Sequence, residues 1–354
     1  MNEKITIISG EKNWMESTAL SQLEGVSRLD GVTKTVGLPD LHAGKSPVGM
    51  VFTAENVIYP HLIGNDIGCG MGLFATGVEL GKYTEKRWVS RLNHIRELGD
   101  IETENPYDEE SPIRDLGTIG SGNHFAEFQR IEEIFDEAAF AELGLPTKEI
   151  ALLIHSGSRG YGNDIFKALN YEIGLSGENA AHYLSQHDNA LKWAKRNRII
   201  TAGKLVDWLG FSATPKLLID LPHNYIERQG DIYTHRKGAV TSKAGLVVLP
   251  GSRGSLTYIL KPAENTSISL DSLSHGAGRK WARSLCFSRI KNKYDRDSIR
   301  RTSLKSAVVC HDTNLLFQEA PEAYKNIKPV LDALLEYNLA TVVATLRPLI
   351  TFKG

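Results

Sequence analysis

The side chains best suited to bind a transition metal are spread widely along the chain. The string GNDIGCGM places Asp66 and Cys69 three residues apart on a backbone rich in glycine. Three imidazoles follow, those of His124, His155 and His223. A carboxylate, a thiolate and imidazoles all suit divalent transition metals. Because no second cysteine lies two to four residues from Cys69, the spacing is not that of a zinc finger. The fold would have to bring these ligands together.

Each of these residues also has a simpler explanation when it is taken singly. Cys69 could be a buried structural thiol, and Asp66 could cap its own backbone in a turn. As a set, five ligands with one bridging thiolate could hold two ions, the arrangement that clamps the attacking and leaving oxygens in phosphoryl transfer. The spacing alone leaves the structural and the metal-binding interpretations open.

A histidine that could act as a nucleophile lies in SLSHGAGRKWAR, at His275. The glycines allow close backbone approach, and a helix beginning in RKWAR would present free N–H groups to an anion. His275 could then attack phosphorus and carry a phosphoryl or nucleotidyl group. A histidine between glycines is also common in plain turns. The other nucleotide-like string, LHAGKSPVG, is not a P-loop, because Pro39 replaces the first glycine and Pro47 opposes the required helix.

Composition indicates a folded protein of 354 residues, with 41% hydrophobic and 23% charged residues and a net charge of −1. The charge is segregated along the chain. Residues 279–301 hold nine Lys/Arg against two Asp, residues 192–198 add four cations, and acidic residues gather in 97–110. The basic tracts are compatible with binding a phosphate backbone, and equally with solvated helix faces.

The three cysteines, an odd and widely spaced set, predict no disulfide framework. Cys286 and Cys310 are interpreted as ordinary buried thiols. No apolar run approaches the roughly 20 residues of a membrane span, and the N-terminal sequence lacks the features of a signal peptide. A cytoplasmic protein without a membrane partner is therefore expected.

The patterns of apolar residues predict a mixed α+β fold in one domain, 1–354, without internal repeats. Several apolar runs end in a histidine or a glycine-rich loop, and such strands deliver side chains to one edge of a sheet. The expected helices cover 13–29, a segment from just after Ser176 to about 199, and 321–340; the expected strands lie within 151–160, 216–224 and 245–255.

Ten strings, read together, resemble the RtcB family of GTP-dependent RNA-splicing ligases. They are LPDLHAG, GNDIGCGM, GTIGSGNHFAE, HSGSRG, HN at 223–224, HRKGA, PGS at 250–252, SHGAGR, EAPEAYK and the terminal KG. They occur in the family's order and extend from about residue 13 to Gly354. The resemblance implies a single-domain RtcB-like fold, a mixed β-sheet core with flanking helices and a central metal and nucleotide cleft. It also implies joining of RNA 3′-phosphate or 2′,3′-cyclic phosphate ends to 5′-hydroxyl ends through a histidine-GMP intermediate.

The resemblance also implies roles for individual residues. Two manganese ions would be held by Asp66, Cys69, His124, His155 and His223, and His275 would be guanylylated by GTP. Guanosine nucleotide contacts would come from Asn123, Phe125, Glu127, Asn224, Pro250, Gly251, Ser252, Arg253, Thr257, His275, Gly276, Ala277, Gly278, Tyr324 and Lys353. Arg159, Arg279 and Arg283 would meet the RNA or the activated phosphate. His42 could support the metal loop without binding the metal.

The chain departs from the family's pattern at one site residue. The usual PGSMG loop reads PGSRG here, so Arg253 adds a positive charge beside the expected triphosphate. The chain resembles the compact bacterial branch of the family that is associated with a peptide-release-factor homologue, which favours RNA repair. The expected partners are tRNA or rRNA fragments with broken ends and an archease-type activator.

Two alternatives to a ligase are compatible with these residues. One is a metal-dependent RNA 2′,3′-cyclic phosphodiesterase or phosphatase that transfers no nucleotide. The other is a non-catalytic protein that binds RNA ends through its basic tracts. Neither alternative needs His275 as a nucleophile, so this residue distinguishes them from the ligase.

Overall fold

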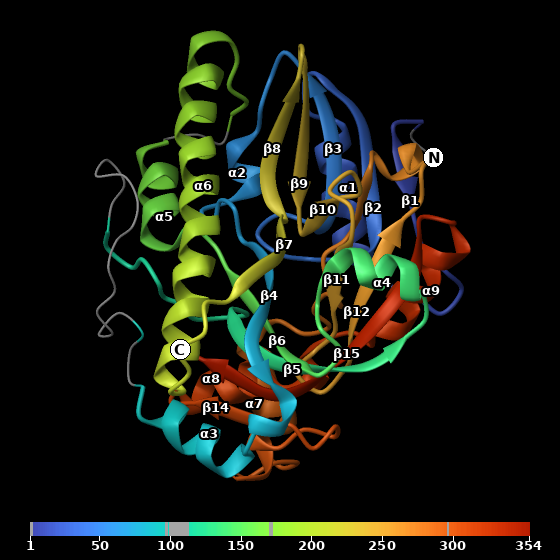
Figure 1. Cartoon of the computed structure of the whole chain (residues 1–354). Coiled ribbons are helices and arrows are strands. Elements are labelled where there is room, and N and C mark those ends of the chain that lie inside the picture. The colour runs from blue at the N-terminus through green and yellow to red at the C-terminus, as the bar shows by residue number, and fades with distance from the viewer. Residues whose placement is uncertain (1–2, 96–97, 99–112, 170–172, 296) are drawn as a thin grey trace.

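The computed structural model describes residues 3–95, 98, 113–169, 173–295 and 297–354 (Figure 1). The helices are α1 Ser17–Ser27, α2 Pro60–Ile63, α3 Glu85–Asn93, α4 Glu137–Leu143, α5 Arg159–Ala168, α6 Gly177–Trp208, α7 Arg283–Ile290, α8 Thr313–Gln318 and α9 Ile327–Glu336, with short 3-10 turns at Leu80–Lys82, Ser267–Ser269, Ser298–Arg300 and Pro321–Ala323. The strands are β1 Ile5–Ile7, β2 Val32–His42, β3 Val48–Glu55, β4 Gly70–Glu79, β5 Phe125–Ile134, β6 Glu149–Ser156, β7 Lys216–Pro222, β8 Asn224–Gln229, β9 Ile232–Lys237, β10 Ala239–Thr241, β11 Val247–Pro250, β12 Thr257–Pro262, β13 Ser272–Ser274, β14 Ala307–Cys310 and β15 Ala340–Lys353.

The described strands form two large sheets and one small pair. One sheet has the order β1-β2-β3-β9-β8, the other the order β11-β12-β15-β5-β6-β4-β7 with β14 beside β15, and β10 pairs with β13. The α+β expectation, a mixed β-sheet core with flanking helices, is confirmed. Figure 1 shows α6 along one side of the molecule, with α4 and α9 on the other.

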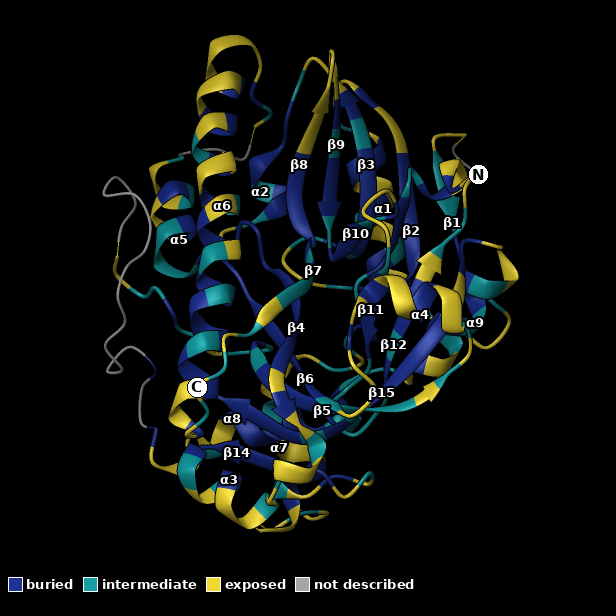
Figure 2. Cartoon of the chain, in the orientation of Figure 1, coloured by how far each residue is buried: buried dark blue, intermediate teal, exposed yellow. Residues whose placement is uncertain are grey.

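The larger sheet is buried on both faces, which explains why its central strands are continuous apolar runs. In β6, Leu153 packs in a core cluster shared with the smaller sheet, α4 and α9. Its neighbours Leu152 and Ile154 pack on the opposite face with residues of α3 and α6. Figure 2 shows these strands buried and the outer turns of α6 exposed.

The two-residue period of the strands places Cys69, His155 and His223 on one face of this sheet, whereas Asp66 and His124 lie in loops just before β4 and β5. On β4, Met71 and Leu73 belong to the first cluster, and Cys69 continues that alternation. On β6, Ala151 and Leu153 belong to the same cluster, and His155 continues their alternation. The strand order β5-β6-β4-β7 makes the four strand ends neighbours, with His155 opposite both Met71 and Phe125.

The segment expected as one helix over 321–340 is broken in the structure, so that expectation was wrong in its first third. A 3-10 turn covers Pro321–Ala323, Tyr324 is extended, and α9 begins at Ile327 after the Asn326 cap. The extended residue bridges to Arg279 on another segment. The other two helices are confirmed as α1 and α6, and α6 continues nine residues beyond the expected end at about 199.

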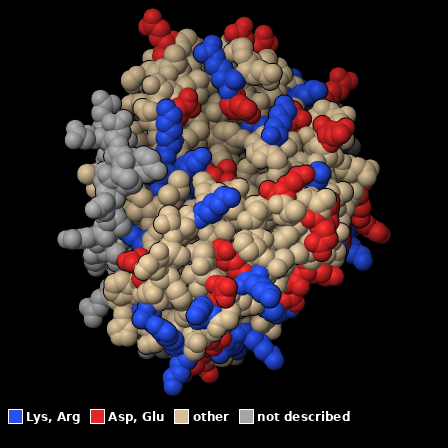
Figure 3. All heavy atoms as spheres, in the orientation of Figure 1, with Lys and Arg blue, Asp and Glu red and all other residues tan. Residues whose placement is uncertain are grey.

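The two basic tracts differ in exposure: most of the described Lys and Arg of 279–301 are exposed, whereas 192–198 is not one solvated face. In the tract 192–198, Trp193, Asn197 and Arg198 are buried. On the face shown in Figure 3, acidic and basic side chains are interspersed. The acidic segment 97–110 lies outside the described residues except for Leu98. Among the described residues, no helix is long and apolar enough to cross a membrane.

Candidate active site

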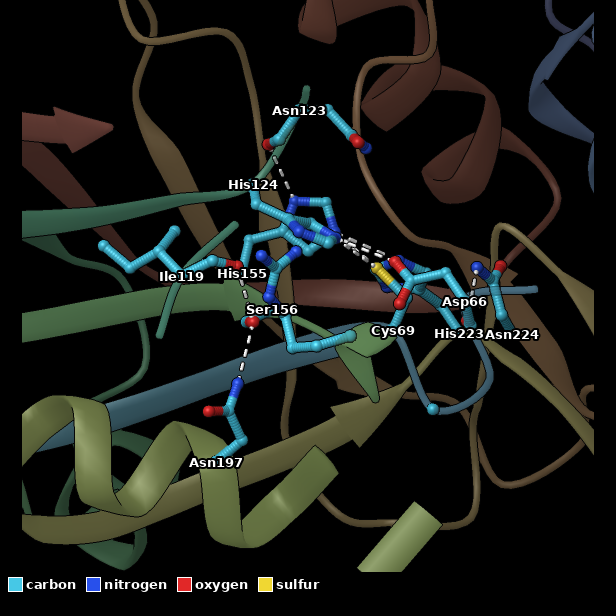
Figure 4. A network of polar contacts seen from close by, with 12 residues as sticks. Asp66, Cys69, Ile119, Asn123, His124, His155, Ser156, Asn197, His223 and Asn224 are labelled. Carbon is cyan, nitrogen blue, oxygen red and sulfur yellow. Dashed lines mark hydrogen bonds and ion pairs between the residues drawn. The ribbon is translucent and has the colours of Figure 1, made fainter. Parts of the chain in front are cut away.

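Five candidate metal ligands lie together at the ends of β5, β6, β4 and β7 (Figure 4). The sulfur of Cys69 is 3.1 Å from Nε2 of His155 and 3.3 Å from Nε2 of His124. Nε2 of His223 lies 3.2 Å from Nε2 of His155, and a carboxylate oxygen of Asp66 lies 2.8 Å from Nε2 of His124. The donor atoms form two groups that share the Cys69 sulfur, one with His155 and His223, the other with Asp66 and His124.

The chemistry of these donors fits two cations. Burial lowers the pKa of His155 and of His223 well below the ordinary value, so both rings are neutral and offer a lone pair. The Nδ1–H of His155 donates to the backbone carbonyl of Asn123 at 3.1 Å, which leaves Nε2 free to coordinate. Burial raises the pKa of Asp66, but the charge and hydrogen bond of His124 outweigh it and hold the pKa below its usual range. Asp66 is therefore ionised and available as a ligand.

Helix α6 braces this cluster through two side chains that the sequence analysis assigned only to a basic tract. One Nη of Arg198 donates to the carbonyl oxygens of Gly68 at 3.0 Å and Ser156 at 2.7 Å, the neighbours of Cys69 and His155. Its Nε pairs with Asp220 at 2.7 Å. Asn197 donates to the hydroxyl of Ser156 at 3.0 Å. These buried polar groups fix the ends of β4 and β6.

Gly157 leaves the space that the Asp66 carboxylate occupies, because it has no Cβ atom. A Cβ at residue 157 would approach a carboxylate oxygen of Asp66 to 2.1 Å. We expect Gly157→Ala to displace Asp66 and weaken manganese binding roughly 10- to 100-fold, as loss of a positioning contact typically does. Isothermal titration with Mn²⁺ measures this. The matched control is Gly203→Ala in α6, where a Cβ meets nothing within 4 Å. Equal affinities for the two variants would contradict the placement of Asp66.

His275 lies beside the metal cluster. Its ring centroid is 4.7 Å from that of His223. Its Nδ1–H donates to a carboxylate oxygen of Asp40 at 2.6 Å, and the Asp40 side chain is fully buried. Because Nδ1 is occupied, Nε2 is the atom free to react. A role for Asp40 was not predicted from the sequence, although Asp40 lies in LPDLHAG, one of the ten strings.

His42 was expected to support the metal loop, but the structure places it on the His275 side. Its Nδ1 lies 2.9 Å from the carbonyl oxygen of Asp40. The left-handed Gly278 (φ 71°) faces it, and a Cβ there would come within 2.4 Å of the Asp40 carbonyl oxygen. Burial lowers the pKa of His42 to about 4, so the ring is neutral. His42 therefore packs under the loop that carries His275.

A cavity of about 1290 Å³ opens over the cluster and over His275. This volume exceeds that of a typical small-ligand site, so it has room for a nucleotide and a second substrate. Most of the residues expected to bind nucleotide line it: Asn123, Phe125, Glu127, Asn224, Pro250, Gly251, Ser252, Arg253, His275, Gly276, Ala277, Gly278, Tyr324 and Lys353. Thr257, His124 and Arg159 are not in the lining. Thr257 is buried and accepts a hydrogen bond from Gln129 at 2.8 Å.

One region of the cavity wall holds a buried carboxylate and a buried ammonium group. Glu127 accepts hydrogen bonds from Thr351 at 2.5 Å and from Gln129 at 2.7 Å. Burial outweighs these bonds and raises the pKa of Glu127 to about 7. Lys353 donates to the carbonyl oxygen of His124 at 3.0 Å, and burial lowers its pKa to about 8. An acceptor and a donor are thus available side by side.

The raised pKa of Glu127 predicts a pH dependence of stability in the protein without nucleotide. Between pH 4.5 and about 7 the folded state holds a proton that the unfolded state has lost, so the free energy of unfolding falls as pH rises. The loss is on the order of 3 kcal/mol. We expect Glu127→Gln to lack this loss, as measured by urea unfolding across that range. Parallel pH profiles for the two proteins would contradict the assignment.

Two arginines expected to meet the RNA or the activated phosphate share one buried carboxylate. Arg279 and Arg283 contact the same oxygen of Glu319 at 3.0 and 3.2 Å. Tyr324 also donates a short hydrogen bond to Glu319. Burial raises the pKa of Glu319, but Lys353 and the two arginines outweigh it and hold the pKa below its usual range. Glu319, which the sequence analysis did not assign, therefore positions both guanidinium groups at the cavity wall.

Arg159 lies outside the cavity lining, whereas Arg253 belongs to the lining and also holds its loop in place. Arg159 donates to the Thr118 hydroxyl at 3.3 Å and packs over Gly120, beside His124. Arg253 is buried, and one of its Nη atoms donates to the carbonyl oxygens of Ile299 at 3.1 Å and Leu316 at 3.2 Å. Arg253 thus ties the PGSRG loop to α8 and its preceding turn. The Nε and the other Nη atom of Arg253 make no hydrogen bond with the described residues, and the residue lines the cavity.

The helix expected to begin in RKWAR does so at the last residue of that string, Arg283. Residues 279–282 are not helical, and Lys280 and Trp281 donate backbone hydrogen bonds to the Ala323 carbonyl. Helix α7 begins only at Arg283. The expected helix start in RKWAR is confirmed, and the side chains of Arg279 and Arg283 add positive charge to the wall of the cavity that His275 lines.

A two-part metal-ligand cluster, a histidine fixed by a buried carboxylate and a cationic cavity wall are typical of metal-dependent enzymes that transfer nucleotidyl or phosphoryl groups. A family model described as tRNA-splicing ligase RtcB matches residues 22–98, 83–173 and 172–354. The chain belongs to the RtcB family.

Characterised relatives cover nearly the whole chain. RNA-splicing ligase RtcB2 of Escherichia coli strain ATCC 25922 is 37% identical over 374 residues, covering 100% of this chain and 97% of the relative. RNA-splicing ligase RtcB of E. coli K12 is 28% identical over 415 residues, covering 96% and 95%. tRNA-splicing ligase RtcB of Archaeoglobus fulgidus is 27% identical over 448 residues, covering 96% and 92%.

Proposed function

We propose that this protein is an RNA ligase that joins 3′-phosphate or 2′,3′-cyclic phosphate ends to 5′-hydroxyl ends, with GTP as cosubstrate and two Mn²⁺ ions. The observation that carries the proposal is the position of His275, whose ring lies 4.7 Å from that of His223 while Asp40 occupies its Nδ1. The relatives' names support RNA as the substrate.

In the first step, Nε2 of His275 attacks the α-phosphorus of GTP. An N–P bond forms, the bond from the α-phosphorus to the bridging oxygen breaks, and pyrophosphate leaves with the electron pair. The Asp40 carboxylate holds the Nδ1 proton and stabilises the positive ring that results. Arg279 and Arg283, fixed by Glu319, face the developing negative charge.

In the following steps the guanylate passes from His275 to the RNA 3′-phosphate, and the 5′-hydroxyl then displaces GMP to close the phosphodiester. Asp66, Cys69, His124, His155 and His223 would hold the metal ions. When bound, the ions supply charge neutralisation at phosphorus and activated water that opens cyclic ends. Sulfur and imidazole donors suit several transition metals, so the choice of manganese rests on the resemblance to the family.

The buried pair Glu127 and Lys353 would select guanine. An ionised carboxylate accepts from the N1–H and N2–H groups of guanine, and an ammonium group donates to its O6. Adenine has a hydrogen-bond acceptor at N1 and a donor at its 6-amino group, so it would fit neither side chain. Asn123, Phe125, Asn224, Tyr324, the loop 250–253 and the loop 275–278 would complete the nucleotide site, and Thr257 would act from behind it by holding Gln129, which donates to Glu127.

The biological setting that we propose is RNA repair in the cytoplasm, on tRNA or rRNA fragments with broken ends. Residues 1–354 would act as one catalytic domain, with an archease-type protein as a possible activator. The test is an RNA-joining assay with defined ends. Joining that requires GTP, Mn²⁺ and a 3′-phosphate or cyclic end is the expected result. Opening of cyclic ends without joining would favour the phosphodiesterase, and RNA binding alone would favour the non-catalytic protein.

A further inference from the structure

The rim of the active-site cavity carries two tryptophans on either side of Tyr324. Trp281 donates its backbone N–H to the carbonyl oxygen of Ala323, and the ring of Trp14 lies 5.9 Å from Nζ of Lys325. Both tryptophans line the cavity that also contains His275 and Cys69. Aromatic side chains at the mouth of a polar cavity are not needed for the proposed chemistry, so their position calls for another explanation.

Trp14 is held in place but remains open to solvent. It is 58% exposed, the highest fraction among the tryptophans with large exposure in the described part of the chain. The preceding residue, Asn13, donates to the carbonyl oxygen of Pro39 at 2.7 Å, next to the aspartate that orients His275. Lys325 in turn donates to the carbonyl oxygen of Leu41 at 2.6 Å. A fixed, exposed indole near the nucleophile is suited to stacking.

The cations around this rim are also open. Lys45, Lys280 and Arg289 are exposed, line the same cavity and form no ion pair with described residues. Lys280 and Arg289 contact the ring of Trp281, at 5.5 and 5.0 Å from its centroid. The ring of Trp281 is thus already in contact with two cations, whereas the ring of Trp14 has one, Lys325 at 5.9 Å. Glu16 is the one acidic side chain of this rim near Trp14 that also lines the cavity.

An exposed aromatic face combined with unpaired cations is the combination that binds single-stranded nucleic acid, with bases stacked on the rings and phosphates near the cations. We propose that Trp14 is a stacking platform for an unpaired nucleobase at the broken RNA end, and that Lys45, Lys280 and Arg289 bind the adjoining phosphates. This inference rests on the proposed function, because it assigns part of the RNA to a subsite of the same cavity.

The guanine base of GTP is the other base that could reach the cavity. The pair Glu127 and Lys353 already offers guanine its hydrogen-bonding partners, whereas Trp14 offers a ring face without a hydrogen-bonding pattern. Stacking on a ring face tolerates any base. A ligase that repairs breaks of varied sequence needs this tolerance at the RNA subsite and selectivity at the nucleotide subsite.

The test is a double-mutant cycle, in which the indole of Trp14 and one RNA base are removed singly and together. Binding to the Mn²⁺-loaded protein without GTP is measured by fluorescence anisotropy for a 3′-phosphate RNA strand and for a 5′-hydroxyl strand. Each strand is also made with an abasic nucleotide at the first, second or third position from its end. We expect Trp14→Ala to weaken binding of one strand roughly 5- to 150-fold, Trp14→Phe to weaken it less, and the Trp14→Ala effect to vanish when one particular base is missing. The strand affected identifies which RNA end the platform holds.

Two controls keep this test separate from the test of the proposed function. Phe135→Ala removes an aromatic side chain that is 54% exposed and lies outside the cavity lining, and it should bind RNA as the native protein does. Guanylylation of the protein by GTP, which needs no RNA, should be unchanged in Trp14→Ala. A Trp14→Ala effect that persists with every abasic strand, the absence of any effect, or an increased KM for GTP would each overturn the stacking platform. Native protein that takes no guanylate would instead overturn the ligase.

Discussion

His275→Ala is expected to abolish joining of RNA 3′-phosphate and 5′-hydroxyl ends, with a rate loss of at least ~10³-fold, because the variant lacks the Nε2 atom that we propose accepts the guanylate. The measurement is single-turnover ligation with GTP and Mn²⁺. Asp40→Asn keeps a side chain of the same shape beside Nδ1 but cannot stabilise a positive ring. We expect it to lose roughly 10²- to 10⁴-fold of the guanylylation rate.

The metal content of these variants is the control. Neither His275 nor Asp40 belongs to the two donor groups, so both variants should bind manganese as the native protein does. Opening of a 2′,3′-cyclic end should also persist in His275→Ala. Ligation by metal-loaded His275→Ala at a rate near the native one would contradict the role of this histidine.

Cys69→Ala is expected to remove both manganese ions together, because its sulfur belongs to both donor groups. The measurement is metal content after dialysis against Mn²⁺, which should fall from two equivalents to near zero. Guanylylation and ligation should be lost with the metal. His223→Ala, which belongs to one donor group alone, should weaken one ion more than the other.

The matched control for the thiol is Cys310→Ala. Cys310 is buried to the same degree as Cys69, but it contacts the backbone carbonyl of Asp312 and lies in neither donor group. Its metal content should equal that of the native protein. Retention of one full equivalent of manganese by Cys69→Ala would show that the sulfur does not bridge the two ions.

Strand periodicity made much of the metal cluster predictable from the sequence. Apolar runs that end at His155 and at His223 are strands in the structure, and the ligands continue the inward alternation of Leu153 and Leu221. A local rule therefore decides the face on which Cys69, His155 and His223 lie, but not the positions of Asp66 and His124, which precede their strands. The order of the strands in the sheet is set by long-range packing, and only the resemblance to a known family indicated that these ends would meet.

The residues that the sequence analysis missed act through partners far away in the chain. Asp40 reaches His275 across 235 positions, and Glu319 joins Arg279 and Arg283 across about 40. An acidic residue in a strand or at a helix end has no local pattern that reveals such a partner. Arg198 was hidden for a different reason, since a run of cations on a helix predicts a solvated face. Burial against Asp220 and two carbonyl oxygens reversed that prediction.

Contacts between distant parts of the chain also explain where the helices at RKWAR and after Pro321 begin. The sequence after Pro321 has helical periodicity, but Tyr324 stays extended because it bridges to Arg279 and donates to Glu319. In RKWAR the helix starts only at the last residue, Arg283, because the backbone of Lys280 and Trp281 pairs with Ala323. In both places tertiary contacts at the cavity wall override helix propensity. Departures from local preference are expected where a site is built.

The most direct test of the account is to locate the nucleotide on the protein. The native protein is incubated with Mn²⁺ and GTP labelled at either the α- or the γ-phosphate, without RNA, and the label is mapped to a residue by mass spectrometry under conditions that preserve phosphoramidate bonds. The account predicts acid-labile label from α-labelled GTP alone, on His275. Label on another residue, or metal-loaded and folded protein that takes no label, would contradict it.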